Sequence, residues 1–340
     1  MRVLFIFYGK CSIIKRMKKL EIAGIELKTP YIQAPLAGYT SYACRKLAYR
    51  YGCSLAYTEM ISSQALVYES KRTKEMLPKH KEEGLVALQL FGGDKDVVLK
   101  SIEIVEKEAY YDFLDFNIGC PVPKVFKQGA GSAWLGREDE LIDLVTEMCK
   151  VSTKPVIVKV RLGLDKDHMN YLELCKRLEK AGVKAIAVHG RTRKELFSGK
   201  VHYDAIREIR EALTIPVIAN GDISLENIDE VREETGCDLF MIGREAIGNP
   251  TIFRNLVLKD EGKEVVTTRN KDEQRELILE HLRELIKEVG DEKKASELMR
   301  GIACFYLKGL TDAKKIKIGL VKASSYKEYE TILKDLKEGD

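Results

Sequence analysis

The sequence lacks three features that would each place the chain in a definite class. Its 340 residues contain no apolar run approaching the roughly eighteen needed to cross a bilayer. Its eight cysteines form no Cys-x-x-Cys pair and follow no regular spacing, which argues against zinc, an iron–sulfur cluster or a disulfide framework. The formal net charge of +4 is too small to identify a partner. We therefore expect a protein of the reducing cytoplasm that neither enters a membrane nor binds a metal ion.

Short apolar runs recur along the chain and alternate with amphipathic stretches. Runs such as 156–160 are β-branched and nearly continuous, as strands buried on both faces are, and helical patterns such as 139–150 and 171–181 lie between them. Eight such units over roughly 230 residues predict a (β/α)8 TIM barrel, with an open doubly wound sheet as the alternative. The predicted strands are 31–35, 55–60, 86–91, 113–118, 155–160, 185–189, 216–219 and 239–242.

The two ends of the chain differ from this repeating part. Residues 1–16 contain an apolar run too short for a typical secretory signal, and Met17 opens a plausible start of its own. We expect residues 1–16 to be an N-terminal extension; the alternative is an extra strand on the barrel floor. Strand patterns stop after about Thr251, and 272–290 reads as a charged, amphipathic helix. These boundaries predict a barrel over 17–260 and a helical domain over 265–340.

The helical part has an uneven charge distribution. Between Lys293 and Lys327 there are nine Lys or Arg residues, against only two acidic residues. A basic face of this kind, with interleaved aromatic residues, is able to hold an RNA backbone. The alternative is an ordinary solvated helix surface. The interleaved aromatic residues are Phe305, Tyr306 and Tyr326.

The segment from Phe113 to Gly131 contains the most informative chemistry. An apolar strand runs into Asn117 and Cys120, which places an amide and a thiol at its carboxyl end. Active sites of parallel-sheet proteins lie at these ends, so both residues are candidates for catalysis or substrate binding. The alternative is a strand-end turn with a buried cysteine, since free cysteine is often buried.

Other strand ends offer residues suited to a phosphorylated cofactor. In barrels, the loops after the seventh and eighth strands commonly bind phosphate through backbone N–H groups, although glycines there also serve tight turns. Lys159 lies within an apolar run and should point inward, as a Schiff-base nucleophile, a phosphate ligand, a charge facing an anionic cofactor or an inert ion pair. His189 is a flavin contact or a structural histidine. The candidates are Pro35, Leu36, Ala37, Gln89, Lys159, His189, Asn220, Gly221, Asp222, Gly243 and Arg244.

Taken together, these residues fit flavin mononucleotide (FMN). Its phosphate would occupy the loops that contain Asn220, Gly221, Asp222, Gly243 and Arg244. Its ring would lie over 35–37, with Gln89 and Lys159 at the polar edge, where the lysine would stabilise negative charge.

The motifs at these strand ends resemble those of the tRNA-dihydrouridine synthase family, most closely its bacterial B-type branch. The resemblance implies that NADPH or NADH reduces bound FMN, that hydride passes to C6 of a uridine in tRNA, and that Cys120 protonates C5. It also implies that Asn117 and Arg161 contact the uracil and that the helical domain binds tRNA, in an enzyme we expect to be a monomer. The motifs are APLAGYT, TEM, QLFGG, DFNIGCPVPKV, GAGSAWL, VIVKVRLG, VHGRTR, IANGDI and IGREAIGNP.

Two segments depart from the family pattern, and three other functions remain open. Ser41 to Arg45 lack the usual acidic residue and aromatic–Arg pair, and Gly301 and Ile302 replace a basic, His-containing run. The alternatives are a flavin barrel such as a dihydroorotate dehydrogenase, an RNA-binding module without catalysis, and a Schiff-base aldolase that uses Lys159.

Overall fold

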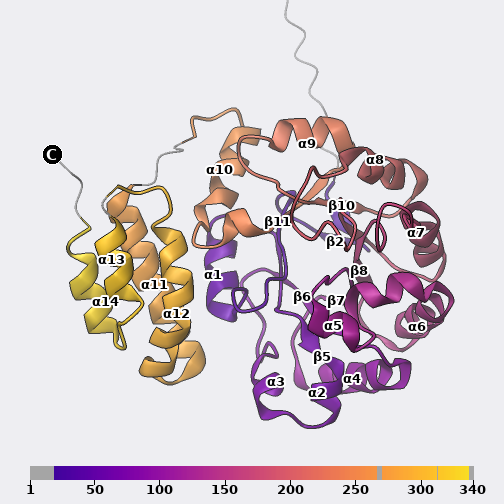
Figure 1. Ribbon diagram of the computed structural model, residues 1–340, viewed down its shortest axis with the longest axis horizontal. Helices are drawn as coiled ribbons and strands as arrows, with labels where there is room; N and C mark the ends of the chain where they lie inside the picture. Colours follow the sequence, from indigo (N-terminus) through magenta and orange to yellow (C-terminus); the bar gives the residue numbers. More distant parts are fainter. Residues whose placement is uncertain (1–18, 266–269, 312, 337–340) are drawn as a thin grey trace, which may run out of the picture.

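A closed barrel of parallel strands forms the body of the molecule (Figure 1). The computed structural model describes residues 19–265, 270–311 and 313–336, so the expected extension over 1–16 lies outside the described residues. Within them, eight strands form a closed parallel ring in which the last strand pairs with the first, and one further short strand extends the same sheet. The predicted fold class is confirmed. The strands are β3 (Tyr31–Gln33), β4 (Leu55–Tyr57), β6 (Leu85–Phe91), β7 (Phe113–Ile118), β8 (Val156–Arg161), β9 (Ile186–His189), β10 (Val217–Asn220) and β11 (Leu239–Ile242).

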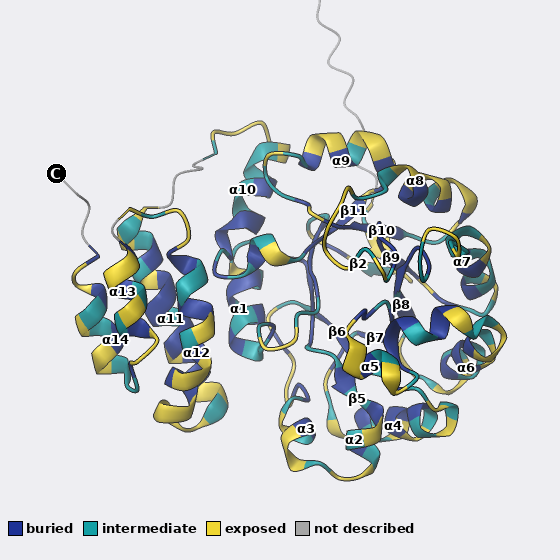
Figure 2. Cartoon of the chain, in the orientation of Figure 1, coloured by how far each residue is buried: buried dark blue, intermediate teal, exposed yellow. Residues whose placement is uncertain are grey.

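Helices surround the barrel and turn their apolar faces toward it (Figure 2). The predicted helical stretches 139–150 and 171–181 are confirmed as α6 (Glu138–Val151) and α7 (Tyr171–Lys180). The longer helices are α1 (Tyr42–Arg50), α4 (Lys95–Glu108), α6 (Glu138–Val151), α7 (Tyr171–Lys180), α8 (Tyr203–Ala212), α9 (Ile228–Thr235) and α10 (Thr251–Asp260). Shorter elements are β5 (Ile61–Ser62), α2 (Ser63–Val67), α3 (Lys71–Glu75), α5 (Pro123–Lys127) and the 3-10 helices η1 (Gly131–Gly136) and η2 (Arg244–Ala246).

The inside of the barrel changes from apolar at the floor to polar at the mouth. The hairpin of β1 (Glu21–Ile22) and β2 (Ile25–Glu26) closes the floor of the barrel. Ile22 of this hairpin packs in one buried cluster with apolar residues of the barrel strands. Because side chains alternate between strand faces, Phe113, Asp115 and Asn117 share one face of β7. Phe113 belongs to the floor cluster, and the two polar residues follow it toward the carboxyl end. The polar groups therefore collect at the mouth.

The C-terminal helices have a core of their own. They are α11 (Lys271–Val289), α12 (Glu292–Tyr306), α13 (Ala313–Leu320) and α14 (Tyr326–Leu333), and they lie beside α1 and α10 (Figure 1). Their apolar stripes meet in a cluster that is separate from the barrel core, because each helix buries only one face. This core includes Leu277, Leu282, Met299, Leu320 and Tyr329.

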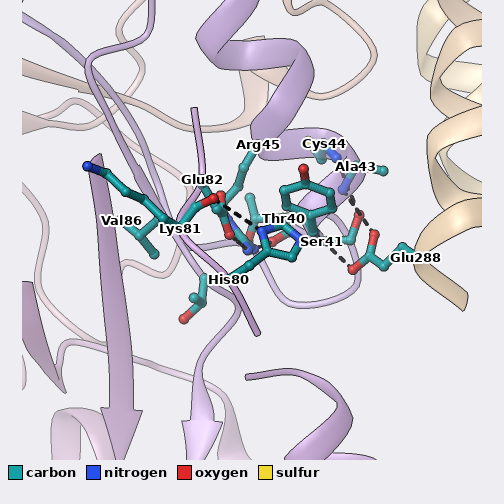
Figure 3. Close-up of polar contacts among 12 residues, drawn as sticks. Thr40, Ser41, Ala43, Cys44, Arg45, His80, Lys81, Glu82, Val86 and Glu288 are labelled. Carbon is teal, nitrogen blue, oxygen red and sulfur yellow. Dashed lines mark hydrogen bonds and ion pairs between the residues drawn. The ribbon is translucent and has the colours of Figure 1, made fainter. Parts of the chain in front are cut away.

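Helix α11 joins the helical region to the barrel through α1. The Glu288 carboxylate accepts hydrogen bonds from the backbone N–H groups of Tyr42 (3.0 Å) and Ala43 (2.9 Å), in the first turn of α1 (Figure 3). Lys46 pairs with Glu284 at 3.0 Å, one helical turn earlier on α11. A carboxylate at a helix N-terminus satisfies free N–H groups and opposes the helix dipole favourably. The helical region thus provides part of the N-cap of a barrel helix.

Buried polar contacts reinforce the segment around this junction. The Arg45 guanidinium forms an almost fully buried ion pair with Glu82 and donates a hydrogen bond to the Thr40 carbonyl at 2.8 Å (Figure 3). Ser41 caps α1 through its side chain, which accepts from the Cys44 N–H. The segment that departs from the family pattern is therefore a well-bonded part of the interface with the helical region.

The three expected aromatic residues of the helical region differ in their surroundings. Tyr306 is 1% exposed, and its hydroxyl bonds to the ring of His281. Phe305 packs edge-on against Tyr39 of the barrel, with ring centroids 5.7 Å apart. Tyr326 is partly exposed, and its hydroxyl accepts a 2.8 Å hydrogen bond from Arg283. The sequence interpretation was therefore wrong for Tyr306, which faces the helical core. Many of the lysines are exposed, including Lys314 and Lys322.

Candidate active site at the barrel mouth

The loop after β7 holds Cys120 in a fixed position. Asn117 Oδ1 accepts hydrogen bonds from the N–H groups of Gly119 (3.1 Å) and Cys120 (2.8 Å). On the other side, Ser132 donates to the Cys120 carbonyl from its hydroxyl (2.8 Å) and its N–H (3.1 Å). Gly131 has a positive φ of 60°, and a Cβ there would lie 2.9 Å from the Cys120 Cβ. Glycine therefore permits the close approach that confines the thiol.

The Cys120 thiol is suited to donate a proton. Its residue is only 9% exposed, and burial raises its pKa, while the charges of Arg161 and Lys159 act in the opposite direction. A raised pKa keeps the thiol protonated at neutral pH, which is the form a general acid requires. A nucleophilic cysteine would instead have a lowered pKa.

Asn117 is part of a hydrogen-bond chain that runs down into the barrel. Its Nδ2 donates to Gln89 Oε1 at 2.8 Å, and Gln89 Nε2 donates to Asp115 Oδ2 at 2.7 Å. Gln89 and Asp115 are fully buried. An amide has two N–H donors and two lone pairs, so Gln89 retains the capacity for a further contact with a ring edge.

Lys159 points into the barrel, as predicted from the apolar residues on both sides of it. Its ammonium donates to Asn220 Oδ1 at 2.9 Å, and Asn220 Nδ2 donates to the Met241 carbonyl at 2.8 Å. Burial and the nearby charge of Arg161 lower the pKa of Lys159 to about 7. An anion placed beside it would raise this pKa again.

His189 lies among positive charges at the mouth. It is opposite Arg161 in the β8–β9 register and opposite Asn220 in the β9–β10 register. Burial, followed by the charges of Lys159, Arg161 and neighbouring arginines, lowers the pKa of His189 well below its ordinary value. The imidazole is therefore neutral, and the mouth has an excess of positive charge that favours an anionic ligand.

The loop after β10 links two arginines through Asp222. Its carboxylate forms ion pairs with Arg191, which is buried, and with Arg244, whose side chain is about half exposed. The bond to Arg191 is the main reason that the pKa of Asp222 is lowered. Both oxygens of the Asp222 carboxylate face cations, and a carboxylate would itself repel an anion. Asp222 would therefore contribute to an anion site by positioning the two arginines and by donating its backbone N–H. Gly221, at φ 131°, adopts a conformation that favours glycine.

The remaining candidates lie on the opposite side of the mouth. Strand order places β3 across the barrel from β8, so 35–37 face Lys159 rather than contact it. The turn is held by hydrogen bonds between Leu36 and Thr40. Next to it, a Cβ on Gly243 would meet only the Ala34 Cβ, at 4.0 Å. This side of the mouth therefore has room for a flat group close to the backbone.

Three residues at the mouth were not given a role by the sequence interpretation. Arg191 follows the sixth predicted strand and could have been chosen for its position, whereas Asp115 is a single charge inside an apolar strand. Phe197 is 53% exposed, and the guanidinium carbons of Arg161 and Arg244 each lie 5.4 Å from its ring centroid. No sequence pattern marks Phe197, because the loop that carries it has no periodicity.

Comparison with known proteins identifies the family. The family model "Dihydrouridine synthase (Dus)" matches residues 32–338. The chain belongs to the dihydrouridine synthase family. The resemblance seen in the strand-end motifs is thereby confirmed, and the match covers both the barrel and the C-terminal helices.

Individual relatives of the chain support the assignment. The chain is 38% identical to tRNA-dihydrouridine synthase B of Pasteurella multocida (strain Pm70), over 86% of this chain and 87% of the relative. It is 36% identical to the protein of the same name from Shewanella oneidensis, over 81% and 85%. Among solved structures, the old yellow enzyme from Trypanosoma cruzi has a TM-score of 0.55 at 14% identity, covering 76% of this chain and 94% of that one. That likeness shows the barrel fold alone.

Neither a metal-binding cluster nor a membrane-spanning helix is present among the described residues. No group of three or more His, Cys, Asp or Glu side chains is arranged to hold a metal ion among the described residues. No described helix combines the length and apolar character required to cross a membrane.

Proposed function

We propose that this protein reduces the 5,6 double bond of specific uridines in tRNA, using FMN as cofactor and NADPH or NADH as reductant. The observation that carries the proposal is the buried, protonated Cys120, held by Asn117 at a cationic barrel mouth. Relatives named tRNA-dihydrouridine synthase B, matched over most of their length, support the same substrate.

The residues at the mouth fit a flat, phosphorylated cofactor. The arginines joined by Asp222 and the backbone at Gly221 and Gly243 would hold the phosphate, and 35–37 would lie against the ring. Lys159 and Gln89 would reach its polar edge from the other side of the barrel. Bound flavin would supply the hydride for C6 of the uracil.

The chain's own residues would position the base and supply the proton. Cys120 would donate its thiol proton to C5, where negative charge develops once C6 receives hydride. Arg161 has five N–H donors, one of which reaches the Thr192 carbonyl at 2.8 Å, so others are available for the uracil oxygens. Its pKa, lowered mainly by burial to about 10, leaves it charged at neutral pH. Asn117 would provide a further amide contact, and the uridine must leave its stack to reach the mouth.

The C-terminal helices are proposed to hold the tRNA. The division is a barrel over 17–260 and a helical tRNA-binding domain over 265–340, in a cytoplasmic monomer. Exposed lysines on α12 and α13 support this, because phosphate contacts dominate RNA affinity. Tyr306 is buried and Phe305 packs against Tyr39, which favours charge, rather than aromatic stacking on these two residues, as the means of binding.

A direct assay tests the proposal. Purified full-length protein should bind FMN, turn yellow and, with NADPH, form dihydrouridine in unmodified tRNA, detected by mass spectrometry of the nucleosides. The control is the same reaction without NADPH. Colourless protein after FMN supplementation would favour an aldolase or a non-catalytic RNA-binding module. A yellow protein that oxidises dihydroorotate but leaves tRNA unchanged would favour the other class of flavin barrel.

A further inference from the structure

A buried carboxyl lies beneath the site and has no part in the chemistry described above. Asp115 is fully buried, two residues deeper along β7 than Asn117. Such a group is costly to bury unless its oxygens are hydrogen-bonded. Gln89 Nε2 donates to Oδ2 at 2.7 Å, whereas Oδ1 and the nearby buried Tyr57 hydroxyl have no hydrogen-bond partner among the described residues. The charge of Lys159 acts on the carboxyl from the neighbouring strand.

The hydrogen-bond chain above Asp115 has only one possible direction. Two backbone N–H groups donate to Asn117 Oδ1, so the other atom of that amide is the nitrogen and must donate. It donates to Gln89 Oε1, which in turn fixes Gln89 Nε2 as a donor. The last donor needs an acceptor at the bottom of the chain, and Asp115 provides it in either protonation state. Each amide orientation therefore depends on the acceptor at position 115.

We propose that Asp115 is a positioning residue: as the terminal acceptor of the Asp115–Gln89–Asn117 chain, it holds the Cys120 turn in the geometry for proton transfer. Without an acceptor at position 115, the Nε2 N–H of Gln89 would be buried and unpaired. Rotating the Gln89 amide to relieve this would turn its Nε2 toward Asn117 Nδ2, so that two donors would face each other. The Asn117 side chain would then lose its fixed orientation and with it the two bonds that hold the turn. The role in proton transfer rests on the proposed function; the effect on the Cys120 turn does not.

Two substitutions that keep the branching at Cγ separate the acceptor from the charge. Asp115→Asn keeps an acceptor for Gln89 and can turn its N–H₂ toward the Tyr57 hydroxyl, but it removes the carboxyl. Asp115→Leu keeps the shape and removes the acceptor. Gln89→Met interrupts the chain one link higher. It replaces Asp115→Leu in the alkylation measurement alone if that variant does not fold, because Gln89 is also a proposed flavin contact. If the carboxyl mattered only as a counter-charge to Lys159, Asp115→Asn would be as harmful as Asp115→Leu.

The first measurement is the rate at which iodoacetamide alkylates Cys120 in the absence of tRNA, followed by mass spectrometry. The thiol is protected by burial, so loosening its turn should speed the reaction by about fivefold in Asp115→Leu, and by less than about twofold in Asp115→Asn. Cys175 and Cys237, which are buried elsewhere, are internal references and should not change. This readout is valid whether or not the protein acts on tRNA.

The second measurement separates the two half-reactions. In Asp115→Leu, dihydrouridine formation at saturating tRNA should fall at least about tenfold relative to the rate of NADPH oxidation, since the acid and the Asn117 amide beside it both lose their positions. Asp115→Asn should remain close to wild type. Equal alkylation of Cys120 in wild type and Asp115→Leu would overturn the proposal, as would faster alkylation of all three cysteines or an Asp115→Asn variant that matches Asp115→Leu. If wild type makes no dihydrouridine but Cys120 responds as expected, the proposed function fails and the positioning of the turn stands.

Discussion

The Lys159 ammonium donates a 2.9 Å hydrogen bond to Asn220 Oδ1, reaching from β8 to β10 past the intervening strand. Asn220 donates its own N–H to the Met241 carbonyl, so its oxygen is oriented toward the lysine. The partner is a neutral amide, while burial and Arg161 both oppose the positive charge. This explains a pKa of about 7, and it leaves the lysine responsive to an anion at the mouth.

Binding of FMN should therefore weaken as the pH rises above 7. A negative group favours the protonated lysine, and above its pKa of about 7 in the free protein a proton must be taken up on binding. We expect the affinity to fall by up to about tenfold per pH unit between pH 7 and 9, measured by quenching of flavin fluorescence. The Lys159→Arg variant, which stays charged, should show little slope. Equal slopes in the two proteins would contradict this prediction.

Replacing Cys120 should affect only the step that needs its proton. Cys120→Ala should lower dihydrouridine formation by roughly a hundredfold or more, while flavin binding and NADPH oxidation persist. Cys120→Ser retains a similar shape and the backbone contacts of the turn but has a far weaker acid, so it should resemble the alanine variant. Wild-type turnover in Cys120→Ala would remove this residue from the mechanism.

The two arginines joined by Asp222 should differ in their effect on stability. Arg191 is 1% exposed and also donates to the carbonyls of Ser198 and Gly199, so Arg191→Met leaves several acceptors unpaired. We expect a loss of about 1–3 kcal/mol in the free energy of unfolding, measured by urea denaturation. Arg244→Ala should cost at most about 1 kcal/mol, because its side chain is half exposed, yet it should weaken flavin binding. A larger loss of stability in Arg244→Ala would contradict this order.

Glu288 should stabilise the junction between the barrel and the helical region. Glu288→Gln weakens the acceptor for the N–H groups of Tyr42 and Ala43, and Glu288→Ala removes it. By analogy with the loss of an N-cap, we expect about 1 kcal/mol for the alanine variant and faster hydrogen exchange at these two amides. Glu276→Ala, an exposed position on the same helix, is the control. Unchanged exchange at Tyr42 and Ala43 would show that Glu288 does not hold α1.

Lysines of the helical region should determine the salt dependence of tRNA binding. A triple substitution to Gln on α13 and after it should weaken binding and lower the slope of log K against log salt by roughly 0.7–0.9 for each lysine–phosphate interaction that it removes. A matched triple at lysines that precede barrel strands, at the end opposite the mouth, should change neither. If both triples behave alike, net charge rather than this surface controls binding. The first set is Lys314, Lys315 and Lys322, and the control set is Lys28, Lys154 and Lys184.

Much of the fold was predictable because barrel strands leave a simple pattern. Each is buried on both faces, so it appears as a short apolar run, and all eight predicted strands are present. Asn117 and Cys120 stood out because polar groups interrupt such a run near its carboxyl end. Asp115 did not, since a lone charge within a strand can face either the interior or the surrounding helices.

By itself, the sequence determined the order of the strands, the end of the barrel that carries the chemistry, and the family. Only the tertiary structure decided which of those residues are bonded to one another. The Asp115–Gln89–Asn117 chain and the Lys159–Asn220 bond join different strands, and the arginines around Asp222 meet across separate loops. Tyr306 is buried and Phe305 contacts Tyr39 because α12 packs on both α11 and the barrel. Periodicity along a chain shows which face of a helix or strand is buried. The bonding partners of a side chain depend instead on strand register and helix docking, and contacts between distant segments determine both.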